Sequence, residues 1–209
     1  MESSQESALL LWLRMAASGK SLFERWHSQE HIPQRLTLPG VLSAERYVSA
    51  CNARYFCRYR LSTPQALASQ AYLAQNQTPP TALARQVEEK LRLEARKIVR
   101  PLASGGDSDR SHGLVVARLV LPTEQGDAPD LAAMLRQRFS PSANAVQLGW
   151  RLFGEHEDHE DRQRIVILDC ADPRHGSRIL AALRALIAPL PGVIALDVTA
   201  YTLQVSQGE

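Results

Sequence analysis

The sequence predicts an α+β protein made of two consecutive halves that share one order of elements. Short apolar segments and amphipathic segments alternate along the chain as strand, helix, strand, strand, helix and strand, and this series occurs twice. A stretch rich in glycine, serine and aspartate at residues 103–111 separates the two series. With 44% hydrophobic and 22% charged residues, the 209-residue chain can bury a substantial core.

In the first half, strands are predicted where apolar or alternating residues lie between turn signals, and helices where apolar residues recur at helical spacing. This rule gives strands at residues 8–16, 41–51, 54–62 and 95–101, and helices at residues 21–32, 64–75 and 81–93. Pro33 is expected to end the first helix at Ile32, and Pro39 with Gly40 to form a turn. Thr63 is the expected cap of the second helix. Helix remains an alternative at residues 95–101.

The second half repeats the order with different residues. Strands are predicted at residues 113–121, 145–153, 164–170 and 193–205, and helices at residues 128–139 and 176–188. Each half therefore reads β-α-β-β-α-β, which is the ferredoxin-like order. We expect tandem ferredoxin-like halves that pack sheet to sheet as an α/β barrel within one chain. The expected boundaries are residues 1–102, a linker at 103–112, and residues 113–209.

The composition argues against several classes of partner. The net charge of +2 arises from 24 basic and 22 acidic residues, which is too balanced to indicate binding to nucleic acid or to an anionic membrane. No segment reaches the ~18 apolar residues that a membrane helix needs. Three cysteines without a CxxC pair suggest reduced thiols. We therefore expect a soluble, cytoplasmic protein.

The most informative segment begins with Trp26-His27 and continues through Glu30-His31, Pro33 and Arg35 to the Pro-Gly turn and Arg46-Tyr47. This pattern resembles the EthD-like branch of the dimeric α/β-barrel superfamily. The resemblance covers roughly residues 8–100, whereas the second half shows only the order of elements. It implies a cavity at the sheet and a helix that directs a histidine toward that cavity.

The resemblance does not specify a reaction, because members of the superfamily share a fold more than a chemistry. It favours a small-molecule enzyme that acts on an aromatic, polyketide-like or catabolic ring compound. The reaction would be proton transfer, as in an isomerase, cyclase or dehydratase, or oxygenation without a cofactor. A non-catalytic barrel that binds a small hydrophobic or aromatic ligand is one alternative, and a haem-binding protein is another. A homodimer is favoured, although two halves in one chain already complete a barrel.

The candidate catalytic residues are His31, His27, Arg35, Arg46, Tyr47 and Tyr55, and Tyr59 is considered beside the two tyrosines. His31, and after it His27, could transfer a proton, because imidazole titrates near neutral pH. Arg35 or Arg46 could hold an anionic oxygen in a guanidinium fork. Tyr47 or Tyr55, and Tyr59 beside them, could donate a hydrogen bond to a carbonyl oxygen. A purely structural role is also open: His31 would then cap the helix end, and Arg35 would form a surface ion pair with Glu30.

Two metal sites are considered and not adopted. The run His27-Ser28-Gln29-Glu30-His31 spells the HxxEH pattern of inverted zinc peptidases. Such a site needs a third ligand from another element, and the surrounding residues indicate the barrel family instead. The segment EHEDHED at residues 155–161 reads as a solvated loop between strands. The sequence therefore predicts no metal and no bound cofactor.

Overall fold

A computed structural model describes residues 7–50, 54–106, 111–122, 130–139, 148–156 and 162–208. The chain divides into two compact units. The first contains Met1–Val99 together with Gln204–Glu209, and the second contains Arg100–Leu203. The two long strands, β4 (Leu91–Gly105) and β8 (Ile194–Gly208), therefore each contribute residues to both units.

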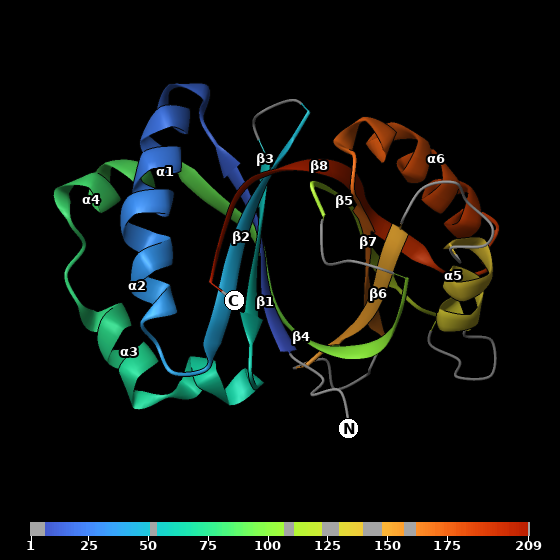
Figure 1. Ribbon diagram of the computed structural model, residues 1–209, viewed down its shortest axis with the longest axis horizontal. Coiled ribbons are helices and arrows are strands. Elements are labelled where there is room, and N and C mark those ends of the chain that lie inside the picture. The colour runs from blue at the N-terminus through green and yellow to red at the C-terminus, as the bar shows by residue number, and fades with distance from the viewer. Residues whose placement is uncertain are drawn as a thin grey trace. The chain divides into compact units, whose positions relative to one another are not determined.

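The sheet of the first unit is antiparallel, in the order β4, β1 (Ser7–Met15), β3 (Arg54–Leu61) and β2 (Val41–Ser49), and β2 neighbours the end of β8. Four helices lie on one side of this sheet (Figure 1). They are α1 (Lys20–Trp26), α2 (Ile32–Leu36), α3 (Gln70–Gln77) and α4 (Ala82–Glu88). The apolar core of this unit lies between the helices and the sheet and includes Leu9, Phe23 and Ile32.

The second unit repeats the arrangement. Its sheet has the order β6 (Leu148–Glu155), β7 (Gln163–Cys170), β5 (Gly113–Val120) and β8, with β4 beside β6. Helices α5 (Leu131–Phe139) and α6 (Gly176–Ile187) cover it. The full order of the described strands, β1-β3-β2-β8-β5-β7-β6-β4, is that of a closed barrel. The predicted fold class, α+β with tandem βαββαβ halves, is confirmed.

The first helix does not end at Ile32 as predicted. It runs from Lys20 to Leu36 as α1, a π-helical turn at His27–His31, and α2. The π turn is defined by the Ile32 N–H, which donates to the His27 carbonyl oxygen. Pro33 lies in the first turn of α2, directly after the π turn. In a regular α-helix its ring would clash with the carbonyl group four residues before it, and it has no N–H to donate there. The extra residue of the π turn thus lets the helix pass a proline.

The predicted boundaries of the next helices are also wrong in part. Pro64 opens a short 3₁₀ helix, Pro64–Ala68, and α3 then begins after Ser69. The Ser69 side chain, not that of Thr63, accepts the capping hydrogen bond, from the Tyr72 N–H at 3.2 Å. The helix predicted at residues 81–93 ends at Glu88, because Leu91 pairs with Met15 of β1. A long-range strand pairing has overridden local helix propensity at these residues.

Strand β4 is longer than the strand predicted at residues 95–101, and helix is excluded there. It continues to Gly105, so the first residues of the expected linker are strand. The expected domain boundaries remain a prediction.

The turn at Pro39 and Gly40 is confirmed: Gly40 has φ +86°, a left-handed conformation in which glycine is favoured.

Candidate functional site

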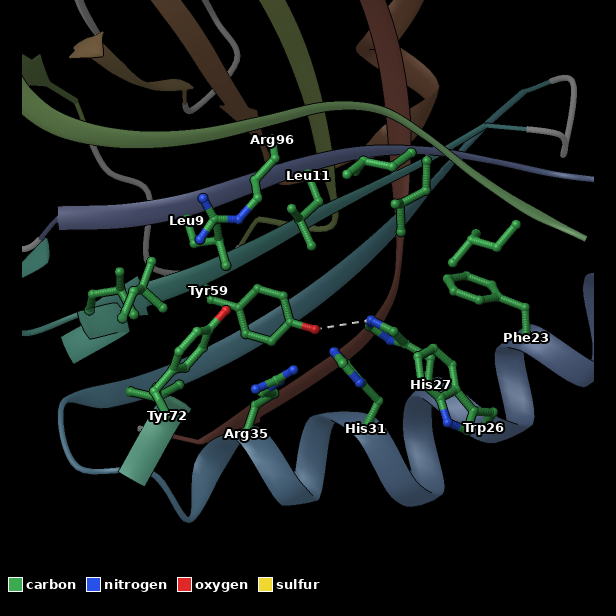
Figure 2. A pocket seen from close by; sticks show the side chains of 16 residues that line it. Leu9, Leu11, Phe23, Trp26, His27, His31, Arg35, Tyr59, Tyr72 and Arg96 are labelled. Atoms are coloured by element: carbon green, nitrogen blue, oxygen red, sulfur yellow. Dashed lines mark hydrogen bonds between the residues drawn. The ribbon is translucent and has the colours of Figure 1, made fainter. Parts of the chain in front are cut away.

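A cavity of about 260 Å³ lies in the first unit, between the first helix and the sheet (Figure 2). Most of its wall is apolar and comes from strands β1, β3 and β4 and from the helix. Its polar groups are two imidazoles, two guanidinium groups and two phenols, namely His27, His31, Arg35, Arg96, Tyr59 and Tyr72. No aspartate or glutamate is among the residues that line it.

One stripe of the first helix supplies the helical side of the cavity. Phe23, Trp26, His27, His31 and Arg35 all face it, and they follow one another at intervals of one, three or four residues. Residues three or four positions apart lie on one face of a helix. The rings pack together: Trp26 and His31 have centroids 4.6 Å apart, and His27 is stacked on His31 at 5.5 Å. The sequence therefore places both histidines at one site.

The π turn that carries the histidines is held by two other strands. Its geometry and Pro33 together leave carbonyl groups without their usual helical donors. The Gln207 side chain of β8 donates to the Ser28 carbonyl oxygen at 3.3 Å. Arg46 of β2 donates to the Glu24 carbonyl oxygen and to the Ser28 hydroxyl oxygen, both at 3.1 Å. These bonds attach the turn to β2 and β8.

His27 forms the inner part of the site. It is almost fully buried, and its Nε2 lies 3.1 Å from the Tyr59 hydroxyl oxygen and 3.7 Å from the Cys57 sulfur. Its Nδ1 has no hydrogen-bond partner among the described residues. Burial, then electrostatic interaction with His31 and with Arg46, holds the pKa of His27 well below its usual value. His27 is therefore a neutral imidazole at physiological pH.

His31 lies between His27 and Arg35 on the helix, and its ring faces Tyr59 across the cavity (Figure 2). Burial, with Arg35 as the second cause, lowers the pKa of His31 to about 3. Within the described part of the chain, the His31 ring makes aromatic contacts but no hydrogen bond. A neutral ring nitrogen is thus available to a ligand as a hydrogen-bond or proton acceptor.

Tyr59 connects the two histidines to the sheet. It extends from β3, and burial raises the pKa of its hydroxyl well above the usual value. The His27 tautomer sets the direction of the bond between them. If His27 carries its proton on Nε2, the ring donates to Tyr59 and the phenol proton points to the cavity. The pair can then donate a hydrogen bond to a ligand oxygen.

Of the six predicted site residues, three line the cavity and three do not. His27, His31 and Arg35 line it. Arg46 acts on the helix backbone instead, and its guanidinium lies 5.7 Å from the Phe23 ring centroid. Tyr55 donates to a Glu24 carboxylate oxygen at 3.0 Å. Tyr47 follows Arg46 on the opposite face of β2 and accepts a hydrogen bond from Arg58 at 3.4 Å.

The glutamate of the HxxEH pattern does not face the cavity with the two histidines. Glu30 accepts a hydrogen bond from Thr81 of the α4 cap at 2.7 Å and does not line the cavity. Among the described residues no group of three histidine, cysteine, aspartate or glutamate side chains could hold a metal ion. Cys57 is buried, and burial raises the pKa of its thiol to about 12. Cys51 and most of the EHEDHED segment lie outside the described residues.

Two residues that line the cavity, Arg96 and Tyr72, were not predicted from the sequence. Neither carries a local signal. Arg96 reaches the cavity because β4 pairs beside β1, where Leu11 is its partner. Tyr72 reaches it because α3 packs beside α2. Tyr59 had a detectable signal, since it alternates with charged residues at residues 54–60 and so shares a face with Tyr55.

Comparison with known proteins supports the fold at low sequence identity. The fold is similar to that of an anthrone oxidase-like protein, with a TM-score of 0.63, 10% identity, and 99% of this chain and 94% of that chain covered. A chlorite dismutase variant from Candidatus Nitrospira defluvii gives a TM-score of 0.62 at 12% identity, with 97% and 92% covered. A monooxygenase-like protein from Lactobacillus acidophilus gives 0.56 at 10% identity, with 98% and 96% covered.

At 10–12% identity these comparisons show that the chain shares a fold with monooxygenase-like and chlorite dismutase-like proteins. No family model matches the sequence, and no curated protein matches it. The EthD-like branch therefore stays a prediction. In the described part of the chain, no helix has the length and apolar character needed to cross a membrane.

Proposed function

We propose that this protein is a small-molecule enzyme that binds an aromatic or polyketide-like ring compound in the cavity of the first unit and transfers a proton on it. One observation carries the proposal: a neutral imidazole without a hydrogen bond, His31, faces an apolar cavity opposite a buried phenol–imidazole pair. A base and a hydrogen-bond donor on the same enclosed space are what proton abstraction next to a carbonyl requires.

The residues take distinct roles in this proposal. His31 accepts a proton from an acidic C–H or O–H group of the ligand. Tyr59, backed by His27, donates to the ligand oxygen on which negative charge develops. The low pKa of His31 makes it a weak base in the empty site. A bound anion raises that pKa, because an opposite charge nearby favours the protonated ring.

The fate of the deprotonated ring defines the reaction type. Return of the proton at another carbon is isomerisation, attack on an internal carbonyl is cyclisation, and loss of hydroxide is dehydration. Reaction of the carbanion with molecular oxygen is oxygenation without a cofactor. The similarity in fold to an anthrone oxidase-like protein makes anthrone a suitable first probe. The EthD-like branch and its ring-compound substrates belong to this proposal.

The test measures exchange of the ligand's proton, so it does not require that the product be known. Anthrone is incubated anaerobically in D₂O with the protein, and exchange of its acidic ring protons is measured by NMR. We expect the native protein to accelerate exchange and His31→Ala to reduce that acceleration about 100-fold or more, in line with general base catalysis. His112→Ala, outside the cavity, is the matched control. Undiminished exchange in a folded His31→Ala variant would refute this role.

Two alternatives have separate outcomes. A barrel that binds a ligand without catalysing a reaction would bind the probe and leave its exchange rate unchanged.

Haem binding would require a histidine ligand and a space for the porphyrin. Histidines do line the cavity, but a porphyrin is larger than a cavity of about 260 Å³. Haem titration is therefore expected to leave the Soret band of free haem unshifted. The predicted homodimer is tested by light scattering.

A further inference from the structure

Two guanidinium groups reach the cavity from opposite sides. Arg35 comes from α2 and Arg96 from β4, and Figure 2 shows them approaching the space beside Tyr59 from the helix and from the sheet. Phe23 and Trp26 lie at the other end of the same space (Figure 2). The cavity is therefore polarised along its length, with an apolar end and a positively charged end.

Arg35 is held in place without its charge being neutralised. Its NH1 donates to the Gln75 side-chain oxygen at 2.9 Å, and its guanidinium carbon lies 4.9 Å from the Tyr72 ring centroid. Gln75 is itself anchored by a bond to the Gln34 carbonyl oxygen at 2.8 Å. These partners are neutral, so they orient the guanidinium and leave its positive charge uncompensated.

Arg96 also lacks a counter-ion. It is an exposed residue at the cavity rim, and it forms no hydrogen bond or ion pair within the described part of the chain. The carboxylate nearest in sequence, Glu94, is already paired with Arg14 at 2.7 Å and Arg54 at 3.3 Å. Since no acidic side chain among the described residues lines the cavity, both guanidinium groups act on it as positive charges without a described counter-ion.

The pKa of His31, the imidazole next to Arg35, also reports a positive potential in the cavity. Arg35 is one of the two causes that lower the pKa of His31, after burial. The same potential that disfavours a proton on His31 favours an anion beside it. Arg35 is half-buried, so leaving its charge without an anionic partner beside an apolar space is costly, and an anionic ligand removes that cost. Arg96 is exposed and adds electrostatic attraction for the same anion.

We propose that Arg35 and Arg96 together bind the carboxylate of an aromatic acid, whose ring occupies the end of the cavity near Phe23 and Trp26. This inference rests on the proposed function and specifies its substrate class. A planar carboxylate accepts paired hydrogen bonds from a guanidinium fork, and the two arginines can each engage one oxygen. Arg96 is thus a specificity-determining residue that the sequence pattern did not reveal.

The test compares two ligands that differ only in charge, 2-naphthoate and 2-naphthamide, by calorimetry on the full-length protein. The native protein is expected to bind the acid at least 10-fold more tightly than the amide. Arg96→Gln and Arg35→Gln should each weaken the acid about 10-fold or more and leave the amide unchanged, as loss of a charge-assisted hydrogen bond implies. Arg92→Gln, an exposed arginine of β4 outside the cavity, is the matched control.

The outcomes separate this inference from the proposed function. Equal affinity for acid and amide in the native protein overturns the carboxylate site and leaves the cavity a site for neutral rings. Unchanged acid affinity in a folded Arg96→Gln variant also overturns it; because Arg96 is exposed, that variant should fold even if Arg35→Gln does not. Binding of neither ligand, together with no exchange on anthrone, overturns both proposals.

Discussion

His27 and His31 are neighbours on one helix, yet they differ in what they can do. His27 is enclosed, with Tyr59 and Cys57 against its Nε2. His31 has no hydrogen bond among the described residues and faces the cavity. A buried, hydrogen-bonded imidazole orients its partner, whereas an imidazole on open space can receive a proton. The division of roles between them follows from burial and not from residue type.

Both histidines should make the folded protein sensitive to acid. The pKa of His31 falls from 6.5 in the unfolded chain to about 3 in the folded protein, and that of His27 is also lowered. Below pH 6.5 the unfolded chain therefore binds protons that the folded protein does not, so the free energy of unfolding decreases as pH falls toward about 3. Urea unfolding between pH 7.5 and 4.5 measures this dependence.

A matched pair of variants isolates the contribution of His31. In His31→Asn the free energy of unfolding should decrease less steeply as pH falls, because the variant lacks an imidazole that binds a proton in the unfolded chain but not in the folded protein. His112→Asn, outside the cavity, should keep the native dependence. Identical slopes for the native protein and His31→Asn would contradict the burial that we assign to this ring.

Loss of the Tyr59 hydroxyl should lower stability and impair the site. Tyr59→Phe removes the one oxygen partner that the buried His27 has among the described residues, which should lower the free energy of unfolding by about 1–3 kcal/mol. Anthrone exchange should fall as well. Tyr55→Phe, which removes a hydroxyl bonded to Glu24 outside the cavity, is the control and should keep the exchange rate. Denaturant unfolding and the exchange assay measure both effects.

At the scale of elements, the first helix depends on strands that come later in the chain. In its π turn, the Ser28 carbonyl oxygen accepts from the Gln207 side chain of β8. Arg46 of β2 donates to the Ser28 hydroxyl and to the Glu24 carbonyl in the turn before it. A π turn is costly alone, so it persists where such contacts support it. The helix that presents the histidines is in this way completed by tertiary structure.

Arg46 is the residue on which this support mainly depends. Arg46→Met should lower the free energy of unfolding by about 1–3 kcal/mol, because the Glu24 carbonyl and the Ser28 hydroxyl lose a buried donor. Hydrogen exchange at the amides of residues 27–32 should accelerate. Arg25→Met, an exposed arginine of α1, is the control. Native exchange at the π turn in the Arg46 variant would show that the turn is stable without it.

At the scale of the whole molecule, the last described residues belong with the first unit. Gln204 accepts a hydrogen bond from Arg46 and donates one to Glu24, both at 3.0 Å. Gly208 has φ +95°, and a Cβ there would lie 2.7 Å from the Ser43 Cα. A glycine is therefore required for the close approach of β8 to β2. The first unit is complete only when the end of the chain has been added.

Removal of residues 204–209 should accordingly destabilise the first unit more than the second. Each unit has tryptophans of its own, Trp26 in the first and Trp150 in the second, so two single-tryptophan variants report on them separately. In the truncated chain we expect Trp26 fluorescence to change at a lower urea concentration than Trp150 fluorescence. Coincident transitions at the native midpoint would contradict the assignment of these residues to the first unit.

The sequence alone determined those features that depend on neighbouring residues. Alternation and helical spacing located the strands and helices of both halves, and the four-residue interval between His27 and His31 placed them on one face. The Pro39–Gly40 turn followed from local backbone preferences. These features need only side-chain periodicity and backbone sterics, which act over a few residues.

Tertiary structure alone decided which polar residues share the cavity. Tyr59, Tyr55 and Tyr47 are chemically equivalent in the sequence, and only strand register and face bring Tyr59 to His27 and direct Tyr47 to the other side. Arg96 arrives through the pairing of β4 with β1, and the helix continues past Pro33 through bonds from β2 and β8. Such contacts join residues far apart in the chain, and local propensity contains no information about them.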